Sequence, residues 1–74
     1  MIIKFKDVET VKAFVNLTST LNDKIEVKND RYIVDGKSIM GLFSLNFNND
    51  LEVITYNDED KNKIEEFIKE NIWK

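Results

Sequence analysis

The spacing of apolar residues changes period repeatedly along the 74 residues, and the order of these periods constrains the fold more than any other feature. Residues 2–6 alternate apolar and charged side chains, which indicates a β-strand with Ile3 and Phe5 on its buried face. From Asp7 onward the apolar spacing becomes three and four residues, which predicts an amphipathic helix capped by Asp7 and ending near Leu21. The stripe that this helix is expected to bury consists of Val8, Val11, Phe14, Val15, Thr18 and Leu21.

A β-hairpin is predicted over residues 24–34. Residues 24–28 alternate strictly, Asn29-Asp30 favours a turn, and the strand pattern resumes over residues 31–34. The side chains expected to face the core are Ile25, Val27, Tyr32 and Val34, whereas Ile33 is expected to face outward.

The remaining residues predict a short helix, a strand and a longer helix. Ser38 is expected to cap a helix that ends near Leu45, residues 51–56 have strand composition, and Asn57-Asp58 is expected to cap the last helix. In the strand, Leu51, Val53 and Thr55 share one face, and Ile54 and Tyr56 share the other. The last helix is expected to bury Ile64, Phe67, Ile68 and Ile72, with Trp73 covering the edge of the core.

The predicted order is therefore β-α-β-β-α-β-α, which indicates an α+β fold: a four-stranded antiparallel sheet with three helices on one face. With 42% apolar residues, we expect a single domain over residues 1–74. The N-terminal apolar run is too short for a signal peptide or a membrane span, so a cytoplasmic protein is expected.

The composition argues against several kinds of chemistry. Without Cys or His the chain has no disulfide and no thiolate nucleophile, and a metal site would need carboxylates alone. The net charge of −3 and the lack of a basic stripe argue against direct nucleic-acid binding. We therefore expect no enzyme activity, cofactor or metal. The last helix intersperses lysines with Glu59, Asp60, Glu65, Glu66 and Glu70, a pattern typical of a solvated surface.

The segment from Asp35 to Leu45 is the most particular in the chain. It places a hydroxyl, Ser38, at the start of a short helix, after a glycine and a lysine. Apolar residues follow at positions 39, 40, 42, 43 and 45, more than one face of a two-turn helix can bury. We expect Leu42 and Leu45 to fill the core, and the others to form an exposed docking surface beside Ser38. The alternative is that all five are core residues. The predicted docking residues are Lys37, Ile39, Met40 and Phe43.

The run Lys37-Ser38-Ile39-Met40-Gly41 resembles the regulatory-serine motif of the HPr family, the small phosphocarrier proteins of the bacterial sugar phosphotransferase system. The resemblance extends from about Asp7 to Phe67 and implies an HPr-like open-faced β-sandwich, in agreement with the pattern. It also implies that Ser38 is phosphorylated by an HPr kinase and that a transcriptional regulator of catabolite repression is a partner.

The chain departs from the family at the phosphocarrier site. It has no histidine, and the position that matches the lost histidine is Asp7, with Glu9 and Thr10 where the family has Arg and Pro. A non-catalytic regulatory protein is therefore expected, similar to the catabolite-repression HPr-like proteins, which also lack the histidine. Alternatives stay open: Ser38 and Asp7 are only helix caps, Asp7 mimics a phosphorylated carrier or accepts phosphate itself, or the domain binds partners without phosphorylation.

The outer face of the sheet is a second, weaker candidate site. Ile33, Ile54 and Tyr56 are expected to lie there among charged residues, and a homodimer through this face is the interaction considered. The charged residues are Lys24, Glu26 and Glu52.

Overall fold

The structure is a computed structural model, and it describes residues 1–46 and 49–72. Trp73, predicted to cover the core, lies outside the described residues. The elements follow the predicted order: β1 (Ile2–Ile3), α1 (Val8–Thr18), β2 (Glu26–Lys28), β3 (Ile33–Asp35), α2 (Ile39–Ser44), β4 (Leu51–Ile54) and α3 (Asp58–Asn71).

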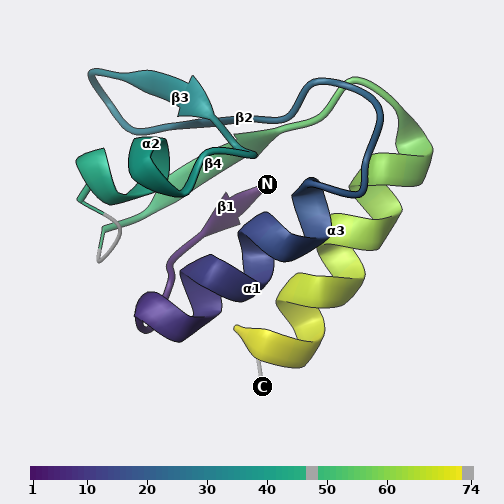
Figure 1. Cartoon of the computed structure of the whole chain (residues 1–74), viewed down its shortest axis with the longest axis horizontal. Helices are drawn as coiled ribbons and strands as arrows, with labels where there is room; N and C mark the ends of the chain where they lie inside the picture. The colour runs from purple at the N-terminus through teal and green to yellow at the C-terminus, as the bar shows by residue number, and fades with distance from the viewer. Residues whose placement is uncertain (47–48, 73–74) are drawn as a thin grey trace.

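The strands form one antiparallel sheet in the order β1-β4-β2-β3. The helices lie on one side of it, and α1 packs against α3 (Figure 1). This arrangement confirms the predicted α+β fold. None of the helices in residues 1–46 and 49–72 is long and apolar enough to cross a membrane.

Alternation along the strands separates a buried face of the sheet from an outer face. In the register, Val27 of β2 lies between Val34 of β3 and Val53 of β4, and Ile3 pairs with Leu51. These side chains face the helices, as the alternation of a pleated strand requires. The buried apolar residues are Ile3, Phe5, Val11, Phe14, Leu21, Ile25, Val27, Leu42, Leu45, Leu51, Val53, Ile64 and Ile68.

The structure corrects several expected boundaries. Helix α1 ends at Thr18 because the hydroxyls of Thr18 and Thr20 donate to the carbonyls of Val15 and Leu17, and the chain turns there. Leu21 is still buried, as expected. Val8, predicted on the buried stripe, is exposed. It is the first residue of α1, and the buried residues of this helix begin at Thr10. The first and last strands are also shorter than predicted.

Tyr32 was predicted to face the core and is 61% exposed. It ends the hairpin turn before β3 begins, so it does not follow the alternation of the strand. Its backbone N–H donates to Asn29 Oδ1, and its carbonyl accepts from the Asn29 N–H. The turn predicted at Asn29-Asp30 is confirmed, and Ile33 faces outward as expected.

Asp60 also differs from the expectation of a solvated surface, because it is only 6% exposed. Its backbone N–H donates to Asn57 Oδ1 at 2.7 Å, which confirms the predicted cap of α3. The Asn57 amide donates in return to Asp60 Oδ2 at 2.9 Å and to Asp23 Oδ2 at 2.6 Å. These bonds hold the carboxylate at the positive end of the α3 dipole and connect α3 to the loop that precedes β2.

Gly36 ends β3 where two backbones approach closely. Its N–H donates to the Ile25 carbonyl at 2.7 Å, and its carbonyl accepts from the buried Thr18 hydroxyl at 2.8 Å. A Cβ at this position would lie 2.6 Å from Ile25 Cγ2. This crowding leaves no space for a side chain.

Replacing Gly36 by Ala is expected to destabilise the fold by about 1–3 kcal/mol, because the new methyl group overpacks the contact with Ile25. The midpoint of thermal unfolding should fall by roughly 4–8 °C for each kcal/mol, measured by circular dichroism. Gly41→Ala is the control. Its Cβ would meet Val34 Cβ at 3.2 Å, a milder overlap than at Gly36, and the gain in helix propensity of about 1 kcal/mol offsets part of its cost, so the midpoint should fall less than for Gly36→Ala. Equal midpoints for the two variants would contradict this account of Gly36.

Candidate functional site

The start of α2 is positioned by a turn that follows β3. The Lys37 N–H donates to Asp35 Oδ1 at 2.9 Å, and the Ser38 N–H donates to the Asp35 carbonyl at 3.1 Å. Asp35 has the turn chemistry that favours this conformation. The turn, together with Gly36, places Ser38 at the first position before α2.

Ser38 is the N-cap of α2, as predicted. Its backbone is extended, with φ −108° and ψ 113°, and its Oγ accepts from the Gly41 N–H at 3.0 Å. A Cβ on Gly41 would lie 3.2 Å from Val34 Cβ and 3.3 Å from Ser38 Oγ. Glycine at position 41 therefore allows the first turn of α2 to pack closely under Ser38, whose side chain is half-buried.

We call Ile39, Met40 and Phe43 the α2 patch. Met40 is 76% exposed and Phe43 is 39% exposed, whereas Ile39 is half-buried against the core. Leu42 and Leu45 are buried, as the sequence predicted. The helix that Ser38 caps therefore exposes apolar side chains at positions 40 and 43, and Ile39 lies at the inner border of this surface.

Lys37, a predicted docking residue, has a contact within the fold. Its Nζ donates to the Leu21 carbonyl at 2.5 Å, and its side chain is half-buried. The acceptor lies just beyond the end of α1, sixteen residues earlier in the chain. No local pattern could have predicted this bond, because it depends on how α1 and α2 pack together.

Asp7 caps α1, as predicted. Its Oδ1 accepts from the Thr10 N–H at 2.8 Å and from the Thr10 hydroxyl at 2.6 Å. The Thr10 hydroxyl is the largest cause that lowers the pKa of Asp7, followed by the Thr10 backbone N–H, and the charge of Lys6 acts in the same direction. Thr10 was missed as a partner, although the spacing Asp-x-x-Thr contains the signal. The Asp7 carboxylate is therefore stabilised in its charged form.

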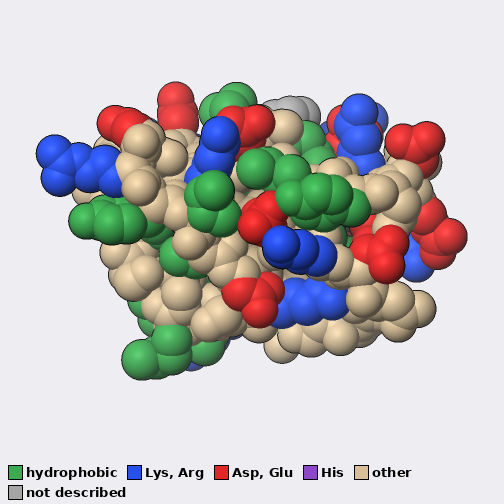
Figure 2. Space-filling model, turned by 90° about the horizontal axis from the view of Figure 1, so that it is seen from above, with side chains coloured by type: hydrophobic (Ala, Val, Ile, Leu, Met, Phe, Trp, Pro, Cys, Tyr) green, Lys and Arg blue, Asp and Glu red, His purple; other side chains and the backbone are tan. Residues whose placement is uncertain are grey.

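The outer face of the sheet mixes apolar and charged side chains (Figure 2). The Tyr56 hydroxyl donates to Glu26, which lowers the pKa of Glu26 and raises the pKa of Tyr56. Lys24 Nζ lies 3.5 Å from Glu26 Oε2 and 5.9 Å from the centre of the Tyr56 ring. Ile54 is half-buried and Ile33 is exposed. The apolar residues predicted on this face are therefore separated by the polar contacts that Glu26 makes with Tyr56 and Lys24.

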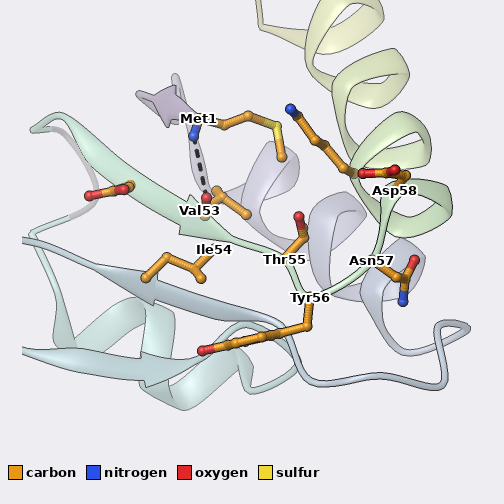
Figure 3. Close-up of a pocket in the computed structure, with 9 residues that line it drawn as sticks. Met1, Val53, Ile54, Thr55, Tyr56, Asn57 and Asp58 are labelled. Atoms are coloured by element: carbon orange, nitrogen blue, oxygen red, sulfur yellow. Dashed lines mark hydrogen bonds between the residues drawn. The ribbon is translucent and has the colours of Figure 1, made fainter.

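An open depression lies where the start of β1, the end of β4 and the first turns of α3 meet (Figure 3). The Met1 ammonium donates to the Val53 carbonyl at 3.4 Å, and Thr55, Asp58 and Lys61 also line the depression. Across residues 1–46 and 49–72, no three carboxylates come together to hold a metal ion. The polar groups in this depression come from separate elements and form no recognisable reaction centre.

No protein-family model matches the chain, and no curated protein matches it. Among solved structures, selenomethionyl Crh, the catabolite repression containing protein of Bacillus subtilis, is similar to this chain with a TM-score of 0.68 and 20% sequence identity. The match covers 95% of this chain and 86% of Crh. That crystal structure revealed an intertwined dimer with a swapped domain. The similarity, with the observed sheet order, shows that this chain has the HPr-like open-faced β-sandwich that the sequence predicted.

The lowered pKa of Asp7 predicts a pH dependence of stability. The charged carboxylate stabilises the fold above its unfolded pKa, and this contribution is lost as the pH falls through the lower pKa of the folded state. A carbon-detected NMR titration of Asp7 should give a midpoint below the ordinary value of 3.8.

Asp7→Asn is the matched variant, because asparagine also caps helices but does not titrate. Between about pH 5 and pH 2, its free energy of unfolding should fall less than that of the wild type. A midpoint for Asp7 at or above 3.8 would contradict the prediction.

Proposed function

We propose that this chain is a regulatory protein with the HPr-like fold, which docks protein partners through the α2 patch and is phosphorylated on Ser38. The observation that carries the proposal is the position of the Ser38 hydroxyl at the start of α2, the same helix that exposes Met40 and Phe43. The chain has no histidine to carry phosphate. It therefore acts by contact rather than by phosphoryl transfer.

Phosphorylation of Ser38 adds a charge of about −2 and three acceptor oxygens at the start of α2. The backbone N–H of Gly41, in the first turn, already donates to the Ser38 side chain, and negative charge is favourable at the start of a helix, so the added charge is tolerated electrostatically. The modification then changes the docking surface and leaves the fold intact. A partner with an arginine or lysine beside an apolar pocket would bind the phosphate and the α2 patch together.

The partners that fit this proposal are an HPr kinase, which adds the phosphate, and a transcriptional regulator that binds the modified protein. The description of Crh as a catabolite repression protein supports the same role. The net charge of −3 fits a protein that acts on transcription through a protein partner and not by binding DNA itself. ATP-dependent phosphorylation of this kind would take place in the cytoplasm.

The alternative is an interaction domain with the same fold and no phosphorylation. Ser38 would then serve only as a cap, and the bond from Lys37 to the Leu21 carbonyl supports a purely structural role for that lysine. A phosphocarrier that uses Asp7 is disfavoured, because its Oδ1 accepts both hydrogen bonds from Thr10 and Glu9, two residues further on, adds negative charge to the same turn.

Incubation with an HPr kinase and ATP is expected to place one phosphate on Ser38, detected by mass spectrometry. Ser38→Ala and Ser38→Asn should both abolish the modification. The Asn variant keeps a capping side chain, so its loss of phosphate cannot be attributed to a frayed helix. Ser44→Ala is the control, since it removes the other hydroxyl of α2, which donates to the Gly41 carbonyl. No transfer to the wild type at any concentration would favour the unphosphorylated interaction domain.

The α2 patch should contribute to recognition by the same kinase. Met40→Asp is expected to lower kcat/KM for phosphorylation by about tenfold, because an exposed apolar contact of about 1.4 kcal/mol is lost. Ile2→Asp is the control, since Ile2 is also exposed and apolar but lies on β1. Equal rates for Met40→Asp and the wild type would show that recognition does not use the patch.

A further inference from the structure

Strand β3 is an edge of the sheet, and its outward side has hydrogen-bonding groups that β2 does not use. The Gly36 N–H donates to Ile25 and the Asn29 N–H donates to Tyr32, so hydrogen-bonded pairs alternate along this ladder. In that alternation the N–H and carbonyl of Ile33 and the N–H of Asp35 point away from β2. Among the described residues, no strand pairs with this side of β3.

The side chains along this edge are exposed and of mixed character. Tyr32 is 61% exposed and Ile33 is 59% exposed. Apolar side chains exposed beside an unpaired strand edge favour association with another chain. Asp35 lies opposite Glu26 in the register, and two acidic side chains facing each other across a ladder are destabilising. Arg31 is exposed in the turn, and within the described residues it forms no ion pair. Glu26 already has Lys24 and the Tyr56 hydroxyl beside it, so among the described residues the carboxylate on this edge that lacks an ion pair is Asp35, and the cation that lacks one is Arg31.

We propose that two copies of this chain associate by pairing their β3 strands antiparallel, with a twofold axis at Ile33. The outward N–H and carbonyl of Ile33 then bond the same groups of the partner's Ile33, and the two side chains meet on the outer face. The Arg31 side chain reaches the partner's Asp35, and the partner's Arg31 reaches Asp35. Each arginine thereby gives Asp35 an ion pair that it lacks among the described residues of its own chain.

The charges select this register among those that the outward groups allow. Centring the axis on Val34 places Ile33 opposite the partner's Asp35, and Arg31 opposite the partner's Lys37. Centring it on Asp35 places two carboxylates opposite each other. Only the register centred on Ile33 combines an apolar pair with two pairs of opposite charges.

The pairing does not depend on Tyr32, which lies before β3 and does not follow its alternation. Two four-stranded sheets then join into one continuous sheet across the axis. Because only three residues of β3 take part, the dimer is weak and depends on concentration and on salt.

Sedimentation velocity at low salt tests the pairing, from about 20 µM to about 1 mM protein. The apparent mass of the wild type should rise above 8.7 kDa as concentration increases. Ile33→Lys should remain at the monomer mass throughout, because a lysine at this edge opposes pairing. Ile2→Lys is the matched control on the other edge strand, where Ile2 faces outward opposite Glu52, and it should associate like the wild type.

A second pair of variants tests the charges. Arg31→Glu should abolish association, because it places a carboxylate beside the partner's Asp35, whereas Lys69→Glu changes the net charge equally on α3 and should have no effect. Circular dichroism on all variants checks that each is folded. A wild type that stays monomeric at about 1 mM overturns the proposal, as does a dimer unaffected by Ile33→Lys. A dimer lost in Ile2→Lys alone also overturns it and locates the interface at β1.

Discussion

The contact on which the rest of the structure depends is the packing of Phe14 between Phe5 and Phe67. Its ring meets Phe5 edge-on, with centroids 5.2 Å apart, and meets Phe67 in the same way at 5.9 Å. Aromatic pairs of this geometry add attraction beyond the area that they bury. Phe14 thereby joins α1 to α3 and to the segment after β1. Phe5 and Phe14 are both buried in the single core cluster, and Phe67 packs against it.

The start of α2 depends on a second set of contacts, in which side chains donate to backbone carbonyls. The carbonyl of Gly36 accepts from Thr18, and the carbonyl of Leu21 accepts from Lys37. Both bonds connect the end of α1 to the turn before α2. These bonds hold the start of α2, and with it Ser38 and the α2 patch, in place against α1. A docking surface that is already ordered avoids the entropy cost of ordering a loop when a partner binds.

The two proposed interaction surfaces differ in chemistry. The α2 patch is apolar and lies on the helix that Ser38 caps, so the proposed phosphorylation would control its binding. The β3 edge offers backbone groups and fixed charges, so its pairing responds to concentration and salt. The two surfaces follow one another in the chain, joined by the turn of Asp35, Gly36 and Lys37, and a change at one is structurally close to the other.

The sequence by itself determined the order of elements, the three capping residues and most of the core. Periodicity and capping are local, so Asp7, Ser38 and Asn57 could be identified from their neighbours alone. It also determined, through the absence of histidine, that the chain cannot carry phosphate on an imidazole. The tertiary structure alone decided that Tyr32 is exposed, that Asp60 is buried and that Lys37 bonds Leu21. These outcomes depend on which elements meet in space, and hydrophobic spacing along the chain contains no information about such long-range partners.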